Sequence, residues 1–117
     1  MTPDQVDEMM NKKSGTLGVS GHKDMRDVMM GAMKGDTRSK LALDMFVYDV
    51  VRYIGQYMGV MGGCDAVVFT AGVGERSEAI RRMVMKPFAA YKLKHLVVPT
   101  DEEGSIARQT AELLKLK

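Results

Sequence analysis

The chain has 117 residues, of which 45% are hydrophobic and 27% charged, a composition that excludes intrinsic disorder and supports one folded domain. The formal net charge of +2 comes from interspersed acidic and basic residues without a basic block, so we expect no nucleic-acid partner. Charges at Asp44, Asp49 and Arg52 interrupt the longest apolar region, so we also expect no membrane partner.

Short helices separated by glycines are predicted in the N-terminal part of the sequence. Thr2 and Gln5 fit the N-cap and N3 positions of a capping box, which predicts a helix over residues 2–11. Glycines and serines in residues 12–21 predict a loop or a short extended segment with tight turns. A second short helix is predicted over residues 23–30.

A long amphipathic helix is predicted over residues 37–61. Its apolar side chains recur every three or four positions: Leu43, Phe46, Val50, Ile54, Tyr57 and Met61. Gly55, Gly59 and Gly63 lie four residues apart and would line one face, where each weakens a helix by about 1 kcal/mol relative to Ala. We therefore expect another segment to approach this face closely. Fraying of the helix end explains Gly63 but not Gly55.

The second half of the chain predicts alternating strands and helices. The apolar run in residues 65–70 is typical of a buried strand in a parallel sheet. Residues 71–74 form a glycine-rich turn, and a helix is predicted over residues 77–84. A short strand over residues 95–98 and a helix over residues 100–116 complete the chain.

The glycine-rich turn, with Val73 between Gly72 and Gly74, is the sharpest local motif. Glycines at the carboxyl end of a strand let backbone N–H groups approach a phosphate or nucleoside closely. A tight strand-to-helix connection without a ligand explains the same spacing equally well. The motif is not a Walker A loop, because no Gly-Lys-Ser/Thr follows it. It is not a complete dinucleotide fingerprint either, because Ser77 stands at the third glycine position.

Two charged clusters are candidate polar sites, and each has a purely structural alternative. Thr100 and Glu103 fit a capping box, which leaves Glu102 free to hold Mg²⁺ directly or through water. The helix dipole also explains acidic residues in a first turn. Asp24 and Arg26 could contact a ribose, a base or a phosphate, or could form an ion pair on a solvated helix face.

The remaining chemically active residue types do not form a catalytic or metal-binding pattern. His22, His95 and Cys64 have no partners at metal or triad spacing, so no catalytic residue is assigned. The methionines also lack a ligand spacing, which favours core packing over copper binding. A single cysteine and a polar N-terminus without a signal segment favour a cytoplasmic protein.

Three segments, taken in order, resemble the C-terminal part of the acetate kinase family. Residues 11–27 contain NKKSG, GVSG and DMRD, residues 69–75 read FTAGVGE, and residues 99–103 read PTDEE. The resemblance covers residues 2–82 and 94–114. Each segment alone is a weak signal, whereas the ordered set is specific.

The resemblance implies an α/β fold, namely a partial ribonuclease-H-like domain of the actin-like and sugar-kinase-like ATPase superfamily. This domain would be helix-rich, with a long central helix and short buried strands, and residues 1–117 would form a single truncated domain on the nucleotide side. The family transfers a phosphoryl group between ATP and acetate, giving acetyl phosphate and ADP. The implied cofactors are ATP or ADP and Mg²⁺, and the implied assembly is a homo-oligomer.

The resemblance also implies roles for particular residues. Asp24, Met25 and Arg26 would contact the adenosine, and Glu102 would help to hold Mg²⁺. A second nucleotide-binding loop would consist of Gly72, Val73, Gly74, Glu75 and Arg76.

Three departures from the family pattern affect this expectation. Arg76 stands where the family usually has Asn, so the expected polar contact is lost or replaced by a long cation. Between Arg82 and Lys94 the chain is much shorter than the family. The preceding region, with the groups that bind acetate and stabilise the transferring phosphoryl, is expected to be missing, so acetate would bind only if that region is supplied. The alternative function is a catalytically inactive nucleotide-binding or oligomerisation fragment.

Overall fold

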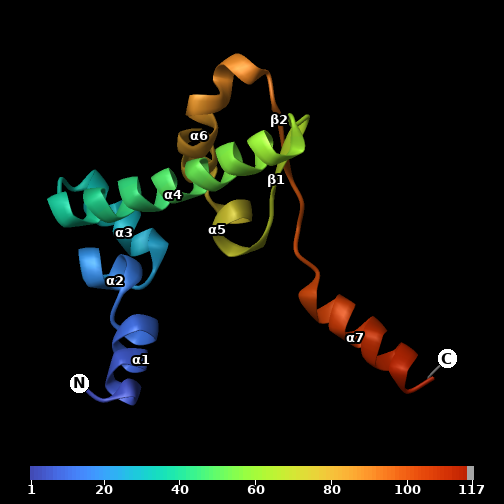
Figure 1. Cartoon of the computed structure of the whole chain (residues 1–117), viewed down its shortest axis with the longest axis horizontal. Coiled ribbons are helices and arrows are strands. Elements are labelled where there is room, and N and C mark those ends of the chain that lie inside the picture. The colour runs from blue at the N-terminus through green and yellow to red at the C-terminus, as the bar shows by residue number, and fades with distance from the viewer. Residues whose placement is uncertain (116–117) are drawn as a thin grey trace.

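The structure, a computed structural model, describes residues 1–115 and is built mainly of helices (Figure 1). In chain order the elements are α1 (Pro3–Lys12), α2 (Gly15–Ser20), α3 (Met25–Met33), α4 (Thr37–Met61), β1 (Ala66–Phe69), α5 (Ala71–Arg76), α6 (Glu78–Met85), the 3-10 helix η1 (Lys86–Tyr91), β2 (Lys94–Val97) and α7 (Glu102–Leu113). The predicted bounds of α4 are confirmed to the residue. The predicted end of the last helix at Leu116 lies outside the described residues.

The prediction of a loop or short extended segment over residues 12–21 is wrong for most of its length, because Gly15–Ser20 forms the helix α2. The helix α2 packs against α4. Its C-cap is Gly21 in the left-handed conformation, and α4 contacts the last carbonyl oxygens of the helix. The Arg38 guanidinium donates hydrogen bonds to the carbonyl oxygens of Val19 at 2.7 Å and Gly18 at 3.3 Å. The stabilising partner therefore comes from a distant part of the chain, which a local glycine and serine count does not detect.

The core lies where α3, α4 and α6 meet beneath β1. Its buried hydrophobic members are Val28, Ala42, Leu43, Phe69, Ile80 and Val84. α4 crosses α3 closely (Figure 1), and Gly31 makes this possible because a Cβ there would overlap the Ser39 hydroxyl. The Ser39 side chain is itself buried at this crossing.

The two strands form a parallel pair, in agreement with the parallel-sheet strand predicted over residues 65–70, but they are less buried than expected. The register runs from Ala66 opposite Lys94 to Phe69 opposite Val97. Only Phe69 of β1 is buried, and every residue of β2 is exposed. The expected burial of the second strand is therefore wrong, because within residues 1–115 no further strand or helix covers it.

The two terminal helices extend away from this core (Figure 1). Neither α1 nor α7 contains a buried residue within the described part of the chain. The radius of gyration is accordingly 18.1 Å, whereas a compact domain of about this size has one of about 13 Å. No helix in residues 1–115 is both long enough and apolar enough to span a membrane.

Candidate functional site

A groove of about 650 Å³ between α3 and α5 brings together residues from two of the predicted nucleotide-binding segments. From the predicted set, it is lined by Asp24, Met25, Arg26, Gly72, Val73 and Arg76. Residues far apart in sequence therefore line one cavity, and no local sequence pattern predicts this proximity.

The groove also has lining residues that sequence reasoning missed, namely Met29, Met30, Met33 and Ser77. Met25, Met29 and Met33 are spaced four residues apart, so they lie on the same side of α3. This four-residue spacing is the sequence signal that could have identified Met29 and Met33 as neighbours of Met25. Ser77 also bridges the two walls, because its hydroxyl donates to the Met29 sulfur at 3.5 Å.

The Asp24 carboxylate is fixed at the start of α3 by two kinds of contact with Arg26. It caps the helix by accepting from the Arg26 backbone N–H at 2.8 Å. It also accepts from the guanidinium, through Nε at 3.0 Å and Nη2 at 2.5 Å. The guanidinium hydrogen bonds lower the pKa of Asp24 to about 2, so the carboxylate is ionised at neutral pH. The local ion pair considered from the sequence is thus present, and both of its members also line the groove.

The residues predicted as a turn after β1 form the helix α5, so that prediction is wrong. Side chains outside this short helix hold both of its ends. At its end, the Arg81 guanidinium donates to the carbonyl oxygens of Gly74 at 2.8 Å and Glu75 at 2.7 Å. At its start, the Ala71 N–H donates to Thr100 Oγ1 at 2.7 Å.

The predicted capping box of Thr100 and Glu103 is also wrong. Asp101 caps α7, accepting from the Gly104 N–H at 3.2 Å. Thr100 instead binds Glu75, because its N–H and its hydroxyl each donate to Glu75 Oε1 at 2.7 Å. These hydrogen bonds lower the pKa of the Glu75 carboxyl, and the bond from the Thr100 hydroxyl has the larger effect.

A polar hollow of about 410 Å³ adjoins the groove and shares Gly72 and Arg76 with it. Glu75 and Glu102 both line this hollow, so the structure brings the predicted metal ligand beside the predicted nucleotide loop. Within residues 1–115, however, no group of three or more His, Cys, Asp or Glu side chains is arranged to hold a metal ion.

Gly74 faces away from both cavities. It does not line either of them, and a Cβ added to it would lie 3.6 Å from Phe69. Gly74 therefore packs on β1, whereas Gly72 is open and a Cβ there would meet no described atom within 4 Å. A nucleotide contact by Gly74 stays a prediction.

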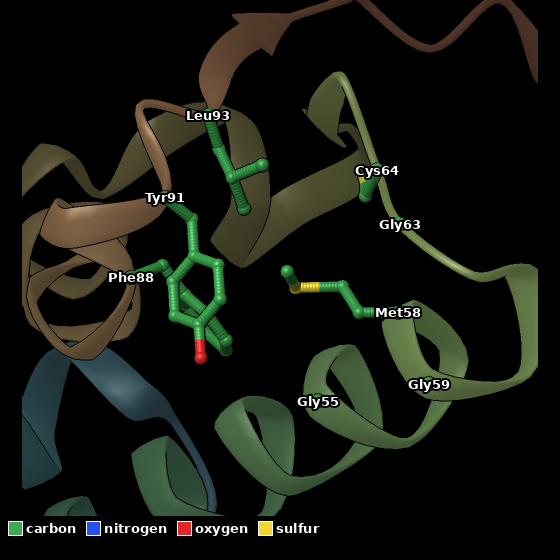
Figure 2. A pocket seen from close by; sticks show the side chains of 8 residues that line it. All are labelled: Gly55, Met58, Gly59, Gly63, Cys64, Phe88, Tyr91 and Leu93. Atoms are coloured by element: carbon green, nitrogen blue, oxygen red, sulfur yellow. The ribbon is translucent and has the colours of Figure 1, made fainter.

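The close approach expected at the glycine face of α4 is not found among the described residues. A Cβ at Gly55 or Gly59 would meet no described atom within 4 Å. These glycines instead border a hollow of about 440 Å³, into which Met58, Tyr91 and Leu93 point (Figure 2).

Comparisons with known proteins identify the family and agree with the fold. The acetokinase family model matches residues 1–110. The acetate kinase of Carboxydothermus hydrogenoformans is 43% identical over 133 residues, which cover 94% of this chain and 33% of that enzyme. The acetate kinase of Acetivibrio thermocellus is 44% identical over 139 residues, covering 98% of this chain and 35% of that enzyme. Both stretches exceed the chain's 117 residues, in agreement with an internal shortening.

Solved structures show the same relationship. The acetate kinase of Porphyromonas gingivalis superposes with a TM-score of 0.87 at 34% identity, covering 97% of this chain and 35% of that one. A propionate kinase from Francisella tularensis superposes with a TM-score of 0.81 at 32% identity, covering 88% of this chain and 32% of that one. The chain thus spans about 35% of the length of the relatives it matches. It belongs to the acetokinase family and carries a partial domain of that family's fold.

Proposed function

We propose that this chain supplies the adenine-nucleotide side of an acetate kinase, which transfers a phosphoryl group between ATP and acetate. The observation that carries the proposal is the groove between α3 and α5. Its volume of about 650 Å³ falls within the range of about 300–1,000 Å³ that is usual for small-molecule sites.

The groove offers a different surface to each part of a nucleotide. The thioethers of Met25, Met29 and Met30 form an adaptable apolar wall suited to a purine ring. The ionised Asp24 carboxylate can accept hydrogen bonds from ribose hydroxyls. The exposed guanidinium of Arg76 lies where the groove meets the polar hollow, so it can pair with a phosphate.

Glu102 would provide one oxygen ligand to the Mg²⁺ that accompanies the nucleotide. The described residues do not fit a complete metal site, because residues 1–115 contain no group of three candidate ligands. No catalytic step is therefore assigned to the metal in this chain.

The chain alone is expected to lack kinase turnover. Phosphoryl transfer depends on several cations and donors placed around the transferring group, and a single such arginine is typically worth about 10³ to 10⁵ in rate. Arg26 is paired with Asp24, which leaves Arg76 as the groove cation that forms no salt bridge within residues 1–115. A partner carrying the rest of the enzyme would have to supply the remaining groups and the acetate site.

An inactive nucleotide-binding and oligomerisation fragment is the second candidate, and we propose a homo-oligomer in either case. The observation in its favour is the apolar surface at the end of α4, where Tyr57 is 62% and Val60 85% exposed. Large exposed apolar patches usually mark interfaces.

The lone Cys64, which has no disulfide partner in the described residues, supports a reducing, cytoplasmic location.

Titration calorimetry with ADP and Mg²⁺ tests nucleotide binding directly. The wild-type chain should bind weakly, and Gly72→Val should abolish binding because the new side chain would project into open groove space. Gly59→Val is the matched control, since it adds the same side chain to an open glycine of α4 outside the groove. Absence of heat with the folded wild type would refute the proposal.

An assay for acetyl phosphate with the pure chain tests whether the chain is inactive without the rest of the enzyme. We expect no turnover above background, and Glu102→Gln should change nothing in that assay. Acetate-dependent ADP formation by the wild type, lost in Glu102→Gln, would instead show that an oligomer rebuilds an active site.

A further inference from the structure

The Thr100 hydroxyl stands at the centre of a hydrogen-bonded cluster that joins the ends of both strands to α5. It donates to Glu75 Oε1 and accepts from the Ala71 N–H, both at 2.7 Å. It also lies 2.9 Å from Thr70 Oγ1. A carboxylate can only accept, so the single Thr100 proton goes to Glu75, and Thr70 must donate to Thr100. The Thr100 oxygen thus uses its donor and both acceptor positions.

The backbone at Ala71 needs such a restraint. Its φ of +57° lies in the left-handed region, which residues with a Cβ rarely adopt. The residue before it, Thr70, occupies the N-cap position of α5 but makes no side-chain capping hydrogen bond in the described structure. The capping contact comes instead from Thr100, which is 29 residues away in the sequence.

We infer that Thr100 is a positioning residue for nucleotide binding: its hydroxyl holds Ala71 in the left-handed conformation and so places Gly72, Val73 and Arg76 along the groove. All three belong to α5, which begins at Ala71, and all three line the groove. The inference rests on the proposed nucleotide-binding function. It adds a residue that lines the adjoining polar hollow and not the groove itself, and to which the family resemblance assigned no role.

Calorimetry with ADP and Mg²⁺ on three variants tests the inference. Thr100→Val keeps the shape of the side chain but removes the hydroxyl. It should weaken ADP binding by roughly tenfold, which is the typical effect of losing one hydrogen bond to a charged group, here the Glu75 carboxylate. Thr100→Ser keeps the hydroxyl and should bind like the wild type. In an Ala71→Gly background, Thr100→Val should cost much less affinity, because glycine adopts the left-handed conformation without strain.

The outcomes separate this inference from the proposed function. If the wild type does not bind ADP, the proposed function fails and the inference fails with it. If the wild type and Thr100→Val bind equally, or if Ala71→Gly does not reduce the loss, only the inference fails.

Hydrogen exchange of the Ala71 amide in the ligand-free wild type gives a readout that needs neither ligand nor variant. Slow exchange supports the contact with Thr100, and exchange at the rate of an open amide overturns it.

Discussion

The two halves of α4 have the same amphipathic pattern but very different surroundings. In the first half, Ala42 and Leu43 are only 2% and 6% exposed, because α2 and α3 pack against this part of the helix. In the second half, Tyr57 and Met61 belong to the same predicted stripe, yet they are 62% and 63% exposed. An amphipathic pattern therefore identifies the face that can be buried, whereas other parts of a protein decide whether it is.

Truncation of one apolar side chain in each half should give the largest contrast. Leu43→Ala should lower the free energy of unfolding by about 2–5 kcal/mol, because it leaves a cavity in the core. Met61→Ala should change it by less than about 0.5 kcal/mol, because the side chain is mostly solvated. Urea denaturation measures both values. Similar losses at the two positions would show that the second half is covered in solution.

Self-association provides the next test, since a second copy of the chain could cover the second half of α4. We expect the wild type to associate at about 50 micromolar, a range in which modest interfaces are populated. Tyr57→Asp should weaken association by roughly tenfold, by placing a charge in the apolar patch. Tyr48→Asp is the matched control, because Tyr48 is also exposed but lies nine positions earlier, on the opposite side of the helix. Sedimentation velocity distinguishes the variants, and a monomeric wild type would contradict the expectation.

The same contrast explains which parts of the fold were predictable from the sequence. The periodicity that defines α4 is local, and its bounds were correct to the residue. The helices α2 and α5 were missed because hydrogen bonds to their ends come from Arg38 and Thr100, which are distant in sequence. Burial of β2 was overestimated because the family resemblance implies the strands of a whole domain, whereas this chain carries only part of that domain.

The candidate site was predicted in a similar, partial way. Resemblance to a family supplied the segments that meet in the groove, because each of them has a recognisable local sequence. It did not supply Met29 and Met33, whose helical spacing from Met25 carries the signal. Nor did it supply the role of Thr100, which local sequence assigns to a helix cap and tertiary structure assigns to Glu75.

The glycine face of α4 allows a smaller stability effect to be predicted. Gly59→Ala should stabilise the monomer by up to about 1 kcal/mol, because alanine favours the helix and its Cβ would meet no described atom within 4 Å. If another chain approaches this face closely in the oligomer, the same variant should weaken association. Thermal unfolding at low concentration and sedimentation at high concentration report the two effects separately. A destabilised monomer would show that the face is already packed.

The smallest predicted effect concerns Asp24, which caps α3, the helix that covers the first half of α4. The hydrogen bonds from Arg26 lower its pKa from 3.8 to about 2. A carboxyl with a lowered pKa in the folded state stabilises the protein above its ordinary pKa, and this contribution disappears as the pH falls through the folded-state value. Asp24→Asn keeps a good N-cap but removes the charge, so the wild type should exceed this variant in stability at pH 6. Their difference should shrink between about pH 4 and pH 2. Arg26→Gln removes the main cause of the shift and should abolish most of this pH dependence. Parallel stability curves for the wild type and Asp24→Asn across that range would show that the ion pair contributes nothing in solution.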